Sequence, residues 1–310
     1  MRQHASMLTP VNLGPQGPWV SPIVYGTWRL LADPDLATPQ AVARRLGLCA
    51  DLGITTIDTA EIYGGYEVEE RLGQALALAP ALKQKLQIVT KFGIYIPNHR
   101  HPERKVAFYN ASAERIVKST EKSLRLLGVE TLEVLLVHRP DWFTAAEDTA
   151  RGLEQVMASG KVKAVGVSNY TVSQFDLLQS CMSKPLVTNQ VELNLLAMGA
   201  MYDGTLDQCQ QRKVRPMAWS PLSGGRLLSG DDPAGVRVRA ACVAMSEKYG
   251  GASVSTLLYA WVMAHPSRCV PVLGTNKEDR IKEAETAAGI KMDQQDWYAL
   301  WEAAKGHKIP

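Results

Sequence analysis

Three ionisable residues stand at the ends of short apolar segments in this 310-residue chain: Asp58, Lys91 and His138. A phenol, Tyr63, follows Asp58 by five residues. A carboxylate, an ammonium, an imidazole and a phenol can together hold and donate a proton. Each also has a structural reading, such as a loop cap, a surface lysine, a core histidine or a packed aromatic. Their joint occurrence favours a site, because buried ionisable groups cost free energy unless they are paired.

The segments that carry these residues are predicted to be strands. Eight apolar or β-branched runs fit this reading: 23–26, 55–58, 86–91, 132–138, 162–168, 187–191, 214–219 and 269–273. Helical patterns alternate with them, which indicates parallel strands joined by crossovers. Eight such units in a chain of this length predict a closed (β/α)8 TIM barrel forming one domain over 1–310. An open doubly wound sheet is the alternative, but its G-x-G-x-x-G fingerprint is absent.

The helices are predicted from caps and glycine stops. Thr38 caps a helix that begins with Pro39, and the stretch from Ser112 ends at Gly128. Further helices are expected over 144–159, 171–181, 236–249, 253–264 and 277–288. Two segments lie outside the repeating units. Residues 8–22 predict a hairpin with its turn at Gly14-Pro15 that closes the bottom of the barrel, and 294–305 predict a C-terminal helical tail.

Composition narrows the class of protein. Lysine and arginine alternate with acidic residues around a net charge of +3, which disfavours nucleic acid as a partner. The five cysteines form no C-x-x-C pair, so we expect neither disulfides nor a metal site. The N-terminal residues lack a signal-peptide pattern, and no apolar run reaches the ~18–20 residues of a membrane span. These features predict a cytoplasmic protein without a membrane partner, as a monomer or weak homo-oligomer.

In barrel enzymes the site lies at the carboxyl ends of the strands. Besides Asp58, Lys91 and His138, the predicted strand ends carry Gly26, Thr27, Trp28, Ser168, Asn169, Gln190, Trp219, Ser220, Gly274 and Thr275. A structural protein has no need for so many polar groups at one end of its strands. The pattern therefore predicts a binding or catalytic site at that end of the barrel.

Several segments, taken in order, resemble the signatures of the aldo-keto reductase superfamily, in its bacterial-type NADP-dependent oxidoreductase branch. They are TTIDTAEIYGGYEVEERLGQAL, VTKFG, LLVHRPD, GKVKAVGVSNYT, NQVELN, AWSPLSGG and VPVLGTNKEDRIKEA. The resemblance extends over nearly the whole chain. It implies an enzyme that reduces a small aldehyde or ketone with NADPH.

The resemblance also implies roles for the four ionisable residues. Tyr63 would donate the proton that the developing alkoxide needs. A free tyrosine has a pKa of ~10, and the ammonium of Lys91 would lower it. Asp58 would hold Lys91 by an ion pair, and His138 would orient the carbonyl oxygen.

The cofactor residues implied by the resemblance fall into groups along the barrel mouth. The nicotinamide end would take Gly26, Thr27, Trp28, Asp58, Ser168, Asn169, Gln190 and Trp219, with Trp219 stacked on the ring. The pyrophosphate would lie on Ser220, Pro221, Leu222, Gly224, Gly225 and Arg226. The 2′-phosphate and adenine would take Gly274, Thr275, Asn276, Lys277, Arg280 and Glu283. Relatives often carry a basic residue where this chain has Gly274 and an asparagine where it has Ala284.

The substrate pocket would be lined by Trp28, Tyr63, His138, Arg139 and Trp142. The loop 92–112 is expected to border the pocket without regular structure and to set specificity. Two other functions remain open from the sequence. One is a non-catalytic, NADPH-sensing accessory subunit, and the other is a lyase that forms a Schiff base on Lys91.

Overall fold

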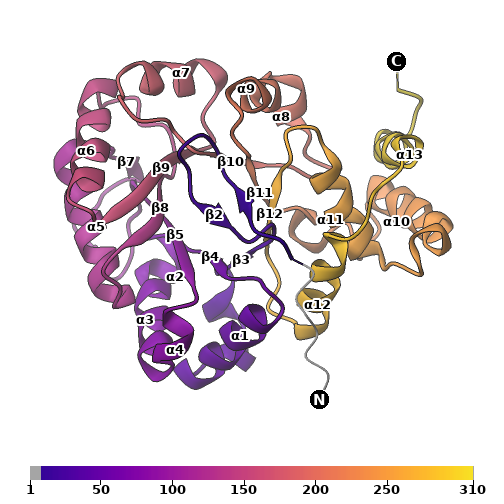
Figure 1. The fold of residues 1–310 in the computed structure, drawn as a ribbon, viewed down its shortest axis with the longest axis horizontal. Helices are drawn as coiled ribbons and strands as arrows, with labels where there is room; N and C mark the ends of the chain where they lie inside the picture. Colours follow the sequence, from indigo (N-terminus) through magenta and orange to yellow (C-terminus); the bar gives the residue numbers. More distant parts are fainter. Residues whose placement is uncertain (1–7, 310) are drawn as a thin grey trace.

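The chain forms a closed barrel of eight parallel strands in a computed structural model that describes residues 8–309 (Figure 1). The barrel strands are β3 (Val24–Gly26), β4 (Thr56–Asp58), β5 (Gln87–Phe92), β8 (Leu132–Val137), β9 (Val162–Ser168), β10 (Asn189–Glu192), β11 (Met217–Trp219) and β12 (Val270–Leu273). Each strand pairs with the next in chain order, and β12 pairs with β3 to close the ring. The prediction of a (β/α)8 barrel is confirmed, and the open sheet is excluded.

Eight helices surround the strands, one after each strand (Figure 1). They are α1 (Pro39–Asp51), α3 (Val68–Leu78), α5 (Ala113–Leu127), α6 (Ala146–Ala158), α7 (Val172–Ser180), α9 (Thr205–Arg212), α11 (Val254–Ala264) and α12 (Glu278–Ala287). Local chemistry sets their ends. Thr38 accepts a hydrogen bond from the Ala41 amide at the start of α1, and Gly128 ends α5 with φ of 65°. None of the helices within residues 8–309 is long and apolar enough to cross a membrane.

Further helices lie outside this ring. The short ones are α2 (Tyr63–Tyr66), α4 (Pro80–Lys83) and α8 (Gly199–Tyr202). The long ones, α10 (Pro233–Met245) and α13 (Gln294–Lys305), pack against each other at one side of the barrel (Figure 1). The helix expected over 236–249 in fact begins at Pro233, because Asp232 caps it, and its last turn is a separate 3₁₀ segment.

The N-terminal hairpin closes one end of the barrel, as predicted. Its strands β1 (Val11–Asn12) and β2 (Trp19–Val20) are antiparallel, and the Gly17 amide donates to the Gly14 carbonyl across the turn, 2.8 Å away. Leu13 is fully buried against the inner side chains of the strands. Its carbonyl accepts from the Arg215 amide just before β11. The hairpin therefore covers the amino ends of the strands and leaves the carboxyl ends open.

The expectation of an irregular loop over 92–112 is wrong. Within it, β6 (Ile94–Tyr95) pairs with β7 (Phe108–Tyr109) as a short antiparallel ribbon. The Tyr66 hydroxyl accepts from the Ile96 amide at 3.0 Å and from Arg104 Nη1 at 2.8 Å. Backbone pairing and this hydroxyl give the segment a defined shape beside the open end of the barrel.

Helices α3 and α5 approach so closely that only glycine fits at one position. A Cβ on Gly73 would lie 1.8 Å from the Leu126 carbonyl oxygen, a backbone atom that no rotamer change can remove. We expect Gly73→Ala to lower the free energy of unfolding by at least about 1–3 kcal/mol. Urea unfolding followed by circular dichroism measures this change.

Gly47→Ala is the matched control, since Gly47 also lies inside a helix and a Cβ there meets nothing within 4 Å. That variant should be up to about 1 kcal/mol more stable than the parent, because alanine favours the helix. Equal stability of the two variants would contradict the close α3–α5 approach.

Candidate active site

The side chain of Lys91 is completely buried at the carboxyl end of β5 and holds three partners. Its Nζ donates to Asp58 Oδ2 at 2.7 Å, to the Thr59 carbonyl at 2.8 Å and to the Tyr63 hydroxyl at 2.9 Å. Asp58 is the last residue of β4, and Tyr63 follows it at the start of α2. The structure thus brings together three of the four ionisable residues that the sequence indicated.

The second oxygen of Asp58 is also engaged. Gln190, on β10, donates from Nε2 to Asp58 Oδ1 at 2.7 Å. This bond spans the barrel interior, since β10 and β4 are not neighbours in the sheet. The carboxylate is therefore fixed from both sides, and the amide nitrogen of Gln190 is committed to it.

Electrostatics keep Lys91 charged and Tyr63 protonated. Burial acts to lower the pKa of Lys91, but Asp58 and Tyr63 outweigh it and raise that pKa. Burial raises the pKa of Tyr63, and the Lys91 ammonium opposes this shift without overcoming it. The expected net lowering of the Tyr63 pKa is therefore wrong for the free protein. Lys91 instead reduces the free-energy penalty for forming a phenolate in a buried place.

His138 follows β8 and completes the set. Its ring centroid lies 5.9 Å from that of Tyr63, and the ring of Trp28 also packs edge-on against Tyr63, at 5.0 Å. Burial holds the pKa of His138 well below its usual value, and the charges of Lys91 and Arg139 lower it further. The imidazole is therefore neutral near pH 7. Its Nδ1 is buried and has no hydrogen-bond partner within residues 8–309.

These residues lie at one side of a cavity of about 730 Å³ at the carboxyl ends of the strands. Many of the residues predicted for the site line it: Gly26, Trp28, Asp58, Tyr63, His138, Arg139, Ser168, Asn169, Gln190, Trp219, Ser220, Pro221, Leu222, Gly224, Gly225, Gly274, Thr275, Asn276, Lys277 and Arg280. The strand-end reading of the sequence and the cavity therefore agree over most of the barrel mouth.

One wall of the cavity is a chain of hydrogen bonds. Ser168 Oγ donates to the Gln190 carbonyl at 2.9 Å and accepts from Asn169 Nδ2 at 2.8 Å. Trp219 Nε1 in turn donates to Asn169 Oδ1 at 3.0 Å. These bonds fix the indole of Trp219, which is only partly buried, as a flat face of the cavity that Tyr63 and His138 also line.

Lys91 does not itself line the cavity, since it is buried and reaches it only through its partners Asp58 and Tyr63. Four further predicted residues do not line it either. Thr27 is fully buried and donates to the Asp58 carbonyl at 3.0 Å. Arg226 bonds Ser223 Oγ at 2.8 Å, and Glu283 accepts from the Ser255 hydroxyl. Trp142 is 77% exposed and packs against Tyr109 outside the cavity. Each of these side chains is turned away from the cavity by a partner that sequence position does not show.

Ten lining residues were not predicted for the site, among them Arg29 and Tyr259. Arg29 spans the two loops above the cavity, donating to the Gly224 carbonyl at 3.3 Å and the Gly274 carbonyl at 3.4 Å. Its position directly after the strand-end Trp28 could have indicated it. Tyr259 lines the cavity from α11, but it lies among apolar residues and gives no sequence signal.

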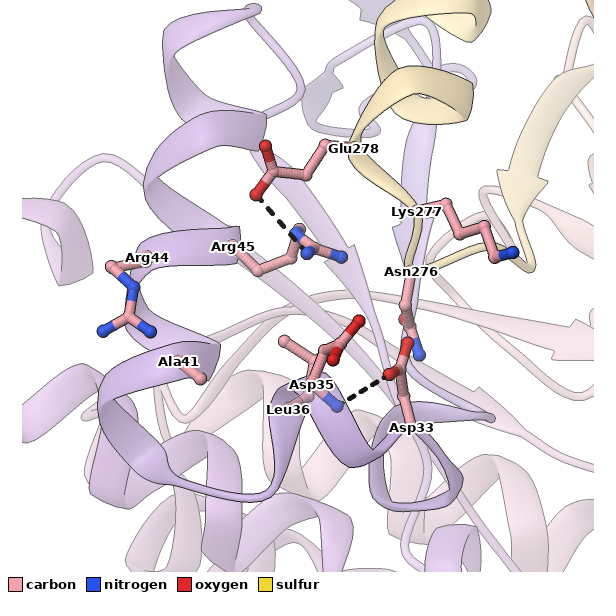
Figure 2. A pocket seen from close by; sticks show the side chains of 9 residues that line it. All are labelled: Asp33, Asp35, Leu36, Ala41, Arg44, Arg45, Asn276, Lys277 and Glu278. Carbon is pink, nitrogen blue, oxygen red and sulfur yellow. Dashed lines mark hydrogen bonds and ion pairs between the residues drawn. The ribbon is translucent and has the colours of Figure 1, made fainter.

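A second cavity of about 470 Å³ lies between α1 and the start of α12 (Figure 2). Arg45 and Glu278 face each other across it, 3.5 Å apart, with Asp33 and Asp35 beside them (Figure 2). Asn276 and Lys277 line both cavities, so the loop before α12 separates them. The carboxylates make this second cavity less suited than the main one to an anion.

No cluster of histidine, cysteine or acidic residues within 8–309 could hold a metal ion.

The buried ion pair gives a prediction about stability. Lys91→Met leaves the Asp58 carboxylate buried with only the Gln190 amide, and we expect a loss of about 3–5 kcal/mol in the free energy of unfolding. Adding Asp58→Asn removes the unpaired charge and should restore most of that loss. Urea unfolding of both variants measures it. A double variant no more stable than Lys91→Met would contradict a dominant role for the buried charge.

Comparison with known proteins gives the family. The model of the family described as "Aldo/keto reductase family" matches residues 22–305. The chain is 44% identical to 6-dehydroglucose reductase of Agrobacterium fabrum, over 94% of this chain and 96% of that protein. It is 41% identical to oxidoreductase YdhF of Escherichia coli, over 98% and 100%.

A solved structure agrees with these sequence matches. It is an aldo-keto reductase from Klebsiella pneumoniae in complex with NADPH, with a TM-score of 0.76 and 26% identity over 98% of this chain and 96% of that one. The barrel, the buried lysine–aspartate–tyrosine group and these matches lead to one conclusion: the chain belongs to the aldo/keto reductase family.

Proposed function

We propose that this protein reduces an aldehyde or ketone to an alcohol with NADPH, and that Tyr63 supplies the proton. The observation that carries the proposal is the triple bonding of Lys91 Nζ to Asp58, Thr59 and Tyr63 beside the cavity. Bound NADPH supplies the hydride. The chain's own residues then stabilise and protonate the negative charge that develops on the substrate oxygen.

Tyr63 is suited to donate because its raised pKa keeps the hydroxyl protonated at neutral pH. When the proton passes to the substrate oxygen, the new phenolate lies 2.9 Å from the Lys91 ammonium. Neutral His138 can donate a ring N–H to the same oxygen, since its ring stands beside that of Tyr63. The arrangement therefore stabilises charge on oxygen both before and after the proton moves.

The cavity also suits NADPH. Trp219 offers a flat face near the catalytic residues, with the polar groups of Ser168 and Asn169 next to it. At the other end, Lys277 and Arg280 line the cavity at the start of α12, where a helix terminus favours an anion. NADPH in the related Klebsiella pneumoniae structure supports this assignment.

The alternatives fit the geometry less well. A Schiff base needs an uncharged, accessible amine, whereas Lys91 is fully buried and its pKa is raised. A purely sensing subunit would not require a protonated tyrosine bonded to a buried lysine. The 6-dehydroglucose reductase of Agrobacterium fabrum makes sugar-derived aldehydes the first substrates to test.

Tyr63→Phe tests the proposal. We expect kcat to fall by about 10²–10⁴-fold, because the proton donor is lost, while NADPH affinity stays the same. Steady-state kinetics on a panel of aldehydes measures turnover, and quenching of protein fluorescence by NADPH and by NADH measures binding. Tyr202→Phe is the control, since Tyr202 is 58% exposed on α8. Unchanged turnover in the Tyr63 variant would rule out this mechanism.

The pKa shifts predict the pH profile of reduction. Tyr63 must be protonated, and its raised pKa keeps it so as pH increases through neutrality. His138 stays neutral, because its pKa lies well below 6.5. We therefore expect kcat/KM for reduction to be flat between about pH 6 and about pH 8. A titration step near the pKa of free histidine would show that His138 gains a proton there.

A further inference from the structure

The buried hydroxyl of Tyr259 has no hydrogen-bond partner in the part of the chain that the structure describes. Tyr259 lies in the middle of α11, and its exposed fraction is 0%. It borders the main cavity. Within residues 8–309, its hydroxyl is the one buried tyrosine hydroxyl that has no partner. Nearly all buried polar groups in proteins are paired, and tyrosine hydroxyls usually find a partner when buried. An unpaired hydroxyl at the edge of a ligand cavity indicates that its partner is the ligand.

The surroundings of Tyr259 do not explain its hydroxyl. Its neighbours along α11 are apolar and buried, namely Leu257, Leu258, Ala260 and Val262. A phenylalanine or leucine in place of Tyr259 would pack equally well among them. Tyr25 offers a contrast nearby, since it is equally buried but donates to Asn276 Oδ1 at 2.7 Å. The hydroxyl of Tyr25 is thus explained by the fold, and that of Tyr259 is not.

Charged groups on α12 identify the kind of ligand. Arg280 and Glu283 are the charged residues whose fields act on the Tyr259 hydroxyl. Glu283 is engaged by Ser255, whereas the side chain of Arg280 forms no hydrogen bond or ion pair with any residue in 8–309. Arg280 and Tyr259 border the same cavity, together with Lys277. An unpaired cation and an unpaired hydroxyl donor that converge on one cavity suit an anion with several acceptor oxygens.

We propose that the Tyr259 hydroxyl, with Arg280, binds the 2′-phosphate of NADPH and so helps this protein to select NADPH over NADH. This inference rests on the proposed cofactor site. A neutral phenol donates one hydrogen bond to a phosphate oxygen, and the guanidinium of Arg280 supplies charge and further donors. NADH carries a neutral hydroxyl in place of the phosphate at that position, so it offers Tyr259 and Arg280 no anionic partner with several acceptor oxygens.

Tyr259→Phe is the decisive variant, because it removes one oxygen atom that has no partner within residues 8–309. We expect its Kd for NADPH to rise about tenfold or more, with its Kd for NADH unchanged. Fluorescence titration measures both constants without any need for turnover. The midpoint of urea unfolding without cofactor should stay the same or rise. Competition by adenosine 2′,5′-bisphosphate should weaken, while competition by adenosine 5′-monophosphate should not.

Two further variants complete the test. Tyr25→Phe loses the bond to Asn276 and should lower the unfolding midpoint, which Tyr259→Phe should not. Arg280→Met should also weaken NADPH binding selectively, and its effect should not add fully to that of Tyr259→Phe, since both groups would hold one phosphate.

The possible failures are distinct. Equal weakening of NADPH and NADH, or no change in either, would overturn the assignment to the 2′-phosphate. A lower unfolding midpoint for Tyr259→Phe would show that the hydroxyl has a partner inside the protein, and would also overturn it. Failure of the parent protein to bind NADPH at all would instead overturn the proposed cofactor site.

Discussion

The structure of the site depends on keeping a charged lysine inside the barrel. An ammonium moved out of water alone would lose its proton, because burial penalises the charged form. Lys91 remains charged because Asp58, the Thr59 carbonyl and Tyr63 all accept from it. These partners come from the end of β4 and the chain after it, so the charge is stable only when neighbouring strands are in register. The charged state of Lys91 therefore depends on the correct formation of the barrel.

The two ends of the barrel differ in structure: one is closed by apolar side chains, and the other opens into the polar cavity. At the amino ends of the strands, the hairpin β1–β2 seals the interior with apolar side chains such as Leu13 and Val20. At the carboxyl ends, loops from nearly every strand surround the cavity and place polar groups in it. Gln190 on β10 donates to Asp58 on β4, and this bond joins two strands that are not neighbours in the barrel. Apolar side chains thus close the barrel beneath Lys91, while Tyr63 borders the open cavity at the other end.

Sequence reasoning succeeded where strand position decides the outcome. Asp58, Lys91 and Ser168 lie at strand ends, and eight parallel strands bring such ends to one rim whatever their neighbours are. Sequence reasoning failed where a pKa depends on opposing electrostatic effects, or where a side chain is held by a residue distant in the sequence. The net pKa of Tyr63 depends on how fully the ring is buried, and Glu283 is drawn aside by Ser255 on another helix. Position along a strand carries no information about either.

The two ends of the cavity differ in how their polar groups are satisfied. The charged Lys91 and Asp58 are already paired in the free protein, with each other and with Tyr63 and Gln190, which holds these side chains in place before any ligand arrives. Beside α12, the Tyr259 hydroxyl and the Arg280 side chain have no partner among residues 8–309. A ligand that pairs them would stabilise the folded state at this end, since any molecule that binds only the folded protein shifts the folding equilibrium. A ligand bound in this cavity would therefore gain new hydrogen bonds at the α12 end, whereas the ion pair of Lys91 and Asp58 needs no ligand to be satisfied.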